Sequence, residues 1–170
     1  MVKRLALTAI AVVALLSPST ATAAGWETTV ETFDAGFVMT SEQCPNLPEG
    51  TTITGTGTGT SVTKTKTDRR GTTTVFNSSI APGRATDRAG NRYRFLYSNQ
   101  FLVSKTSSEL LFTGRMVDLF VLKGNGPASL RNGFLANIRT NLGDVFEFDP
   151  IFEFGDPIDF ETGEAECDPL

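Results

Sequence analysis

The sequence predicts an all-β protein, a single antiparallel β-barrel of about eight strands, with a β-sandwich as the alternative. Beyond residue 23, no segment has the spacing of apolar residues that is typical of an amphipathic helix. Apolar and polar residues alternate instead, and clusters of Gly, Pro, Asn and Asp recur at hairpin spacing. The barrel is favoured because several predicted strands are longer than sandwich strands usually are.

Each predicted strand is bounded by turn residues. The strands cover residues 26–39, 51–67, 71–81, 92–105, 109–123, 130–141, 145–148 and 151–154. Asp34-Ala35-Gly36 is expected to interrupt the first strand, and Pro82-Gly83 is expected to end the third. Asp149-Pro150 is expected to separate the last two strands, because proline removes a backbone donor from the ladder.

The first 23 residues have the features of a secretory signal peptide. Lys3 and Arg4 form a short basic start, residues 5–16 form an apolar run, and Ala21-Thr22-Ala23 provides a cleavage site of small residues. The apolar run is too short for a stable transmembrane anchor. We therefore expect residues 24–170 to form one domain with an acidic C-terminal tail, secreted from the cell or held in its envelope.

The chain contains two cysteines, Cys44 and Cys167. In an oxidising compartment an isolated pair of cysteines usually forms a disulfide bond. Both lie close to prolines in turn-like contexts, so we predict a Cys44–Cys167 disulfide that ties the C-terminal tail to the loop after the first strand. The chain-entropy model gives such a long closed loop a stabilisation of about 4–5 kcal/mol.

The formal net charge of the chain is −4. Nucleic acids and anionic lipid surfaces require basic footprints, so this charge predicts neither as a partner. The charges are nevertheless segregated. Residues 24–63 and 140–170 contain no Lys or Arg, whereas residues 64–139 contain all the Lys and Arg that follow the signal peptide. We interpret these residues as solvated surface charge that keeps a secreted protein soluble, with an interaction face as the alternative.

Alternating aromatic residues predict the inner face of the sheet. In residues 92–105 the odd positions are mainly aromatic, whereas the first even positions are arginines. The last predicted strands place Phe146, Phe148, Phe152 and Phe154 inward by the same argument. We interpret this face as a packed core or as the lining of an apolar cavity. For the cavity, the predicted ligand-binding residues are Tyr93, Phe95, Tyr97, Asn99, Phe101, Phe112, Met116, Asp118, Phe120 and Phe134.

Residues 54–60 alternate threonine and glycine, which places three glycines on one face of the strand. Glycine inside a strand usually marks a sharp bend or the close approach of another group. We interpret these glycines as positions that let the sheet coil or that make room for aromatic rings. Space for a ligand is the alternative.

The chain contains no histidine, which excludes Ser-His-Asp and Cys-His catalysis and ordinary His-based zinc sites. A G-x-S-x-G nucleophile motif and a nucleotide-binding fingerprint are also missing. The acidic residues near the C-terminus have no spacing that matches a compact calcium loop. We therefore predict no catalytic residue, no metal and no cofactor.

Asp118 interrupts the apolar stretch of residues 116–122. A buried carboxylate is costly unless it is paired, so either an arginine from a neighbouring strand meets Asp118 or its pKa rises. Arg115 and Arg139 are the candidate partners. The two interpretations are a structural ion pair and a pocket acid that orients a ligand or transfers a proton.

Three segments resemble small secreted proteins of actinobacteria that have no assigned activity. They are residues 90–99 (GNRYRFLYSN), 124–127 (GNGP) and 154–158 (FGDPI). The resemblance extends over most of the chain after the signal peptide, and it implies no catalytic residue. The predicted barrel is also similar in shape to calycin-type and allene-oxide-cyclase-like barrels, by fold analogy alone.

The leading functional hypothesis is a secreted protein that binds a small apolar or aromatic molecule. One alternative is a non-enzymatic module of the cell envelope or of protein interaction. It would bind through basic residues of the middle segment, namely Arg84, Arg88, Arg92, Arg94 or Lys64. The other alternative, which is less favoured, is an isomerase or cyclase that relies on a carboxylate, Tyr or Arg.

Overall fold

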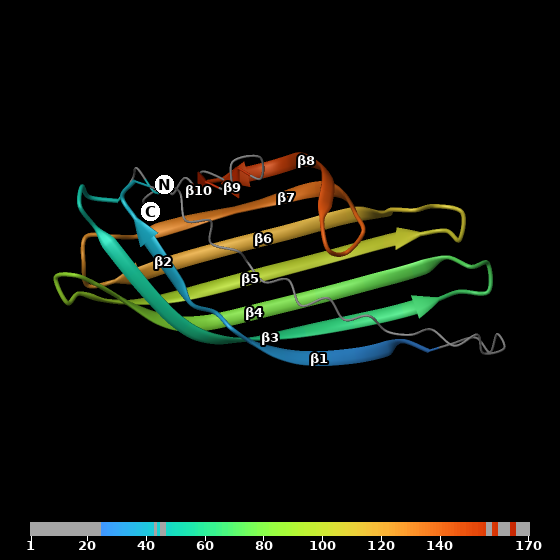
Figure 1. The fold of residues 1–170 in the computed structure, drawn as a ribbon, viewed down its shortest axis with the longest axis horizontal. Coiled ribbons are helices and arrows are strands. Elements are labelled where there is room, and N and C mark those ends of the chain that lie inside the picture. Colours follow the sequence, from blue (N-terminus) through green and yellow to red (C-terminus); the bar gives the residue numbers. More distant parts are fainter. Residues whose placement is uncertain (1–24, 43, 45–46, 156–157, 160–163, 166–170) are drawn as a thin grey trace, which may run out of the picture.

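The computed structural model describes residues 25–42, 44, 47–155, 158–159 and 164–165, so the predicted signal peptide and Cys167 lie outside the described residues. These residues form strands and no helix, which confirms the prediction of an all-β protein (Figure 1). The strands are β1 (Glu27–Asp34), β2 (Phe37–Thr40), β3 (Thr52–Thr67), β4 (Thr73–Asp87), β5 (Arg92–Lys105), β6 (Phe112–Gly124), β7 (Leu130–Thr140), β8 (Val145–Phe154), β9 (Ile158–Asp159) and β10 (Glu164–Ala165).

The first eight strands form one antiparallel sheet in the order β1-β3-β4-β5-β6-β7-β8, with β2 also paired to β3 (Figure 1). From β3 to β8 each strand pairs with the next along the chain, as in a meander. No ladder joins β8 to β1 or β2 in the described part of the chain, so the sheet is not closed and the predicted barrel is not confirmed. No helix in these residues is long and apolar enough to cross a membrane.

The expected interruption of the first strand is present. β1 ends at Asp34, β2 begins at Phe37, and both pair with β3. Between them, the amide of Ala35 donates to the carbonyl of Gly57 at 3.0 Å. Two short strands, interrupted at the predicted place, therefore pair with one edge of β3.

Pro82 does not end a strand, which corrects the boundary predicted there. β4 continues through Pro82 to Asp87. The β3–β4 ladder omits two pairs here, Thr58 with Pro82 and Gly59 with Ala81, and proline has no N–H to donate. On its other side Pro82 pairs with Leu96 of β5, so the β4–β5 ladder is continuous.

Alternation along the strands gives the sheet two faces. We call inner the face that carries the odd-numbered residues of β3, β4 and β5 and the even-numbered residues of β6 and β7. The opposite face is the outer face. Most of the buried apolar side chains of these strands belong to the inner face, as the aromatic alternation predicts.

Two apolar clusters lie on the inner face. The Phe95 cluster consists of Cys44, Leu47, Ile53, Ala85, Tyr93, Phe95, Leu122, Ala128 and Leu130. The Phe134 cluster consists of Val75, Val103, Phe112, Phe134, Ala136 and Ile138. Phe37 of β2 packs against Phe95 and Phe120, with ring centroids 5.0 and 5.5 Å apart. Because β3, β4 and β5 separate β2 from β6 in the sheet, this contact requires the sheet to curl strongly around its inner face.

Glycines on the inner face make room for the aromatic rings. A Cβ atom on Gly55 would overlap the ring of Phe37, and a Cβ atom on Gly83 would overlap the ring of Phe95. Gly57 lies under the same ring, since a Cβ atom there would be 2.9 Å from Phe95 Cζ. The structural interpretation of the threonine–glycine run is therefore confirmed.

β8 is a single strand where two were predicted. Its pairing with β7 shifts register between Leu135 and Ala136, which leaves Ile151 as an extra residue in a β-bulge. Asp149 and Pro150 lie within this strand and remain paired with β7. The strand therefore continues through Asp149-Pro150, where a break was predicted, and the irregularity in its pairing is the bulge at Ile151.

The bulge also reverses the face that the following side chains occupy. Phe148 is on the inner face, where its ring meets Phe134 edge-on with centroids 4.9 Å apart. Phe152 and Phe154 lie on the outer face, opposite β7 positions of that face. Phe146 is 58% exposed. The prediction that all four phenylalanines of this segment point inward is correct only for Phe148.

Candidate functional site

A carboxylate lies on the inner face between the two apolar clusters. β6 supplies Asp118, and β5 supplies Asn99, which is directly opposite, and Tyr97. The hydroxyl of Tyr97 and the amide of Asn99 both donate to Asp118 Oδ2, each at 2.9 Å. All three residues are partly exposed, so solvent reaches them. We call Tyr97, Asn99 and Asp118 the carboxylate cluster.

The surroundings of the cluster shift two pKa values. Burial raises the pKa of Asp118 above its ordinary value, and the hydrogen bonds from Asn99 and Tyr97 oppose this rise. The pKa of Tyr97 is raised too, first by burial and then by the charge of Asp118. The cluster therefore holds a carboxyl group that gains a proton more readily than a solvated aspartate does.

The cationic partners considered for Asp118 lie elsewhere. Arg115 occupies the outer face of β6. Arg139 of β7 forms a salt bridge with Glu147 of β8, with Nη1 and Oε1 2.5 Å apart. Asp118 has no Lys or Arg partner among the described residues. Of the two outcomes expected for Asp118, the raised pKa is the one present.

Hydroxyl and amide groups extend the polar region across β3 and β4. The amide of Asn77 donates to Ser61 Oγ at 2.8 Å and to Thr63 Oγ1 at 2.9 Å. The hydroxyl of Ser79 lies 3.0 Å from Ser61 Oγ and 3.1 Å from Asn77 Oδ1. Ser79 is directly opposite Asn99. A polar belt therefore runs from β3 to the carboxylate cluster.

Asn132 carries a buried acceptor without a partner. The residue is 8% exposed, and its Oδ1 accepts no hydrogen bond from the described residues. It lies opposite Phe120 and two residues from Phe134, which is opposite Asp118. An unsatisfied buried oxygen costs about 1–3 kcal/mol. Asp118 Oδ1 differs from it, because Asp118 is partly exposed; both hydrogen bonds within the cluster go to Oδ2, which leaves Oδ1 to solvent or to a ligand.

The ten residues predicted to bind a ligand all lie on the inner face, but the fold divides them into three groups. Tyr93, Phe95 and Phe120 belong to the Phe95 cluster or pack against it. Phe101, Phe112, Met116 and Phe134 do the same in the Phe134 cluster. Tyr97, Asn99 and Asp118 form the carboxylate cluster between them.

Tyr93 differs from the prediction in the use of its hydroxyl. This group donates to Asp87 Oδ2 at 3.0 Å, and Asn91 Nδ2 donates to the same oxygen at 2.8 Å. Hydrogen bonds, first of all from the Asn91 side chain, lower the pKa of Asp87. The Tyr93 hydroxyl therefore supports the turn between β4 and β5 and does not face the carboxylate cluster.

Sequence reasoning did not select Asn77, Ser79 or Asn132. Strand parity alone places them on the inner face. Their proximity to Asp118 depends on the register of four strands, which no pattern in a single sequence specifies. The one sequence feature that could have indicated these residues is a polar side chain at an inner-face position of a strand near β6.

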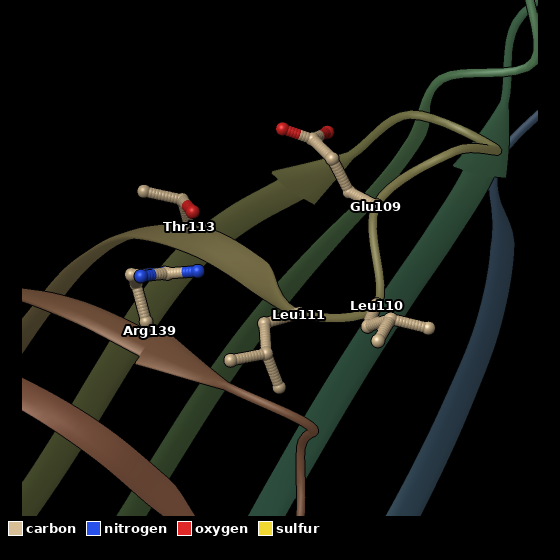
Figure 2. Close-up of a pocket in the computed structure, with 5 residues that line it drawn as sticks. All are labelled: Glu109, Leu110, Leu111, Thr113 and Arg139. Carbon is tan, nitrogen blue, oxygen red and sulfur yellow. The ribbon is translucent and has the colours of Figure 1, made fainter.

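A hollow of about 280 Å³ lies at the turn between β5 and β6 (Figure 2). Its lining residues are Glu109, Leu110, Leu111, Thr113 and Arg139. Leu110 is 90% exposed, and Arg139 is already paired with Glu147. Glu109 accepts hydrogen bonds from the amide and hydroxyl of Thr106 at 2.6 and 2.8 Å, which lower its pKa. The charged groups of this hollow are thus engaged, and none of the ten predicted residues lines it.

The described residues contain no group of three or more His, Cys, Asp or Glu side chains that could hold a metal ion. Cys44 is fully buried in the Phe95 cluster. Because Cys167 lies outside the described residues, the disulfide between the two cysteines stays a prediction.

Comparison with known proteins finds no family model, no curated protein and no solved structure that matches the chain.

Proposed function

We propose that the protein binds a small molecule on the inner face of the sheet, at the carboxylate cluster. The ligand has an apolar or aromatic body and a polar group that donates hydrogen bonds, such as an amine. Two oxygens carry this proposal, on a face that is otherwise rich in aromatic side chains. The buried Asn132 Oδ1 accepts no hydrogen bond from the described residues, and neither hydrogen bond of the carboxylate cluster goes to the partly exposed Asp118 Oδ1.

The chemistry of these two oxygens favours a donor, and in particular a cation. A protonated amine would supply the positive charge that Asp118 lacks among the described residues. Hydrogen bonds to charged groups contribute about 1.5–3 kcal/mol. A carboxylate of the same shape would face two acceptors and a negative charge, so it is expected to bind poorly.

Apolar contacts for the body of the ligand flank the cluster on both sides. Met116 and Phe120 lie on the same face of β6 as Asp118, two residues before it and two residues after it. Met116 packs against the Phe134 cluster and Phe120 against the Phe95 cluster. Both side chains are partly exposed, so each has surface left to cover a ligand. This arrangement does not require a closed barrel, and closure of the sheet remains a proposal.

The proposal is tested by NMR titration with two probes of similar shape and opposite charge, 2-phenylethylamine and 3-phenylpropionate. We expect the amine to shift the side-chain amide signals of Asn99 and Asn132, and the acid to leave them in place. Asp118→Asn should weaken amine binding at least about tenfold, the equivalent of about 1.4 kcal/mol.

Asp149→Asn is the matched control for that variant. Asp149, like Asp118, accepts a hydrogen bond from an asparagine, because Asn137 donates to it at 3.0 Å. Unlike Asp118, Asp149 is exposed and lies on the outer face, directly opposite Asn137. This substitution should leave amine binding unchanged. Equal binding of the two probes, or equal loss of affinity in the two variants, would contradict the proposal.

The Tyr97–Asp118 hydrogen bond is the observation that favours the enzyme alternative. A carboxyl group with a raised pKa beside a tyrosine is suited to proton transfer in an isomerisation. Chromatography after incubation with 3-cyclohexen-1-one distinguishes the two functions, because removal of a proton from C2 and return of a proton to C4 convert this probe into its conjugated isomer. A binding protein returns the probe unchanged after long incubation, whereas an enzyme yields a second species that the Asp118→Asn variant no longer forms.

A further inference from the structure

The outer face of β3 to β7 carries basic residues and no acidic residue. Its basic residues, all of them exposed, are Lys64, Lys66, Arg84, Arg92, Arg94, Arg115, Lys123, Arg131 and Arg139. Among the described residues, only Arg139 of this set forms a salt bridge. We call these nine residues the basic face. Surfaces that serve only solubility usually intersperse both signs of charge.

Three members of the basic face are directly opposite one another on adjacent strands. Arg84 of β4 pairs with Arg94 of β5, and Arg94 pairs with Lys123 of β6. Neighbouring strands lie about 4.8 Å apart, so the backbone positions of these three cations fall within about 10 Å. Like charges directly opposite destabilise a sheet. The described residues place no carboxylate against any of the three.

The outer face of the sheet also exposes aliphatic side chains among these basic residues. Ile80 is 50% exposed, Leu102 is 54% exposed and Val117 is 46% exposed, and all three belong to the outer face. Ile80 and Val117 lie between the Arg84–Arg94–Lys123 row at one end of the strands and Arg115 with the two lysines of β3 at the other, and Leu102 is directly opposite Arg115. A soluble anionic polymer makes no use of such side chains, whereas the interfacial region of a bilayer accommodates both aliphatic groups and cations.

The net charge of the whole chain, −4, predicts no anionic surface as a partner. That prediction treats the charge as evenly spread, whereas the fold gathers basic residues on the outer face of β3 to β7, where there is no acidic residue. The acidic residues of the sheet edges belong to β1 and β8. A second copy of the chain is not a suitable cover for the basic face, because two such faces brought together would oppose cations with cations.

We propose that the outer face of β3 to β7 docks on an anionic phospholipid surface. Arg84, Arg94 and Lys123 bind headgroup phosphates, and Ile80 and Val117 enter the interfacial layer. The phosphate geometry suits arginine, whose planar guanidinium forms two parallel hydrogen bonds to one phosphate. This inference is independent of the small-molecule site, which occupies the inner face.

The test is sedimentation of the purified protein with vesicles of phosphatidylcholine alone or mixed with phosphatidylglycerol. We expect binding to the mixed vesicles only, with a steep decrease between low and physiological salt. The triple variant Arg84→Ser, Arg94→Ser, Lys123→Ser should bind about a hundredfold more weakly, given the typical contribution of each cation near an anionic membrane. Circular dichroism should show that its sheet is intact.

A matched triple variant, Arg69→Ser, Arg70→Ser, Arg88→Ser, makes the same change in net charge at exposed turn positions. It should lose far less affinity. Equal losses in the two variants would show non-specific attraction and overturn the proposal, as would absence of binding to the mixed vesicles.

The double variant Ile80→Ser, Val117→Ser separates a membrane from a soluble polymer. It should weaken vesicle binding at least about tenfold, because apolar contact is part of membrane docking. Inorganic polyphosphate is the competing probe. If polyphosphate binds more tightly than the vesicles and the double variant binds vesicles normally, a soluble polyanion replaces the membrane as the partner and the proposal is wrong.

Discussion

Gly83→Ala tests whether the curl of the sheet depends on aromatic rings seated over glycines. A Cβ atom at this position would overlap the Phe95 ring and would lie 2.6 Å from the carbonyl oxygen of Thr56. Phe95 is only 5% exposed and Thr56 contributes backbone, so neither neighbour can move aside easily. Overpacking of this kind costs about 1–3 kcal/mol.

A smaller gain opposes that cost, because alanine is about 0.5–1 kcal/mol more favourable than glycine inside a strand. The expected net loss is about 0.5–2 kcal/mol, which lowers the Tm of a domain of this size by about 2–8 °C. Urea and thermal unfolding followed by circular dichroism measure both quantities. Gly36→Ala is the control. The nearest atom to a Cβ there is the carbonyl oxygen of Gly55 at 3.7 Å, so stability should stay the same or rise slightly.

A double-mutant cycle with Phe95→Leu assigns the effect to the ring. In the leucine background, Gly83→Ala should cost at least about 0.5 kcal/mol less than in the wild type. If the two substitutions are additive, or if Gly83→Ala leaves stability unchanged, the reasoning that links glycines, rings and curl is refuted.

Further predictions concern single groups. Because the pKa of Asp118 is raised in the fold, the stability that protonation contributes is present below its ordinary value of 3.8 and is lost as the pH rises through the folded pKa. The stability of Asp118→Asn relative to the wild type should therefore increase with pH across this range, as thermal melts at a series of pH values would show. Asn132→Leu removes a buried acceptor without a partner, so it should raise stability by about 1 kcal/mol and abolish amine binding. Tyr93→Phe should lower stability by about 0.5–1.5 kcal/mol, measured by urea unfolding, because it removes a hydrogen bond to the β4–β5 turn. Peptide mapping without reduction should find Cys44 bonded to Cys167, and detection of two free thiols in secreted protein would contradict this.

The fold class and most strand positions follow from local patterns. Alternation identified the inner face of β5 and β6, and the threonine–glycine run marked the positions over which Phe33, Phe37 and Phe95 lie. These features depend on neighbours along one strand or on adjacent strands, so a single sequence contains them.

The features that sequence reasoning missed depend on register and closure. The Ile151 bulge reverses the faces of Phe152 and Phe154, and an extra residue in a ladder leaves no mark on the alternation of a short strand. Pro82 stays within β4 because the β3–β4 ladder omits only two pairs and then resumes in the same register. Whether β8 pairs with β1 is a property of the whole sheet, and the described residues contain no such pairing.

The central claim is that the carboxylate cluster is a binding site for a ligand that donates hydrogen bonds. Its most direct test is NMR titration of the Asp118 carboxyl carbon, with and without 2-phenylethylamine. The pKa of Asp118 should be higher than that of a solvated aspartate in the free protein, because burial raises it. It should fall when the amine is present, because a bound cation stabilises the carboxylate. An ordinary pKa in the free protein that the amine does not change would contradict the claim.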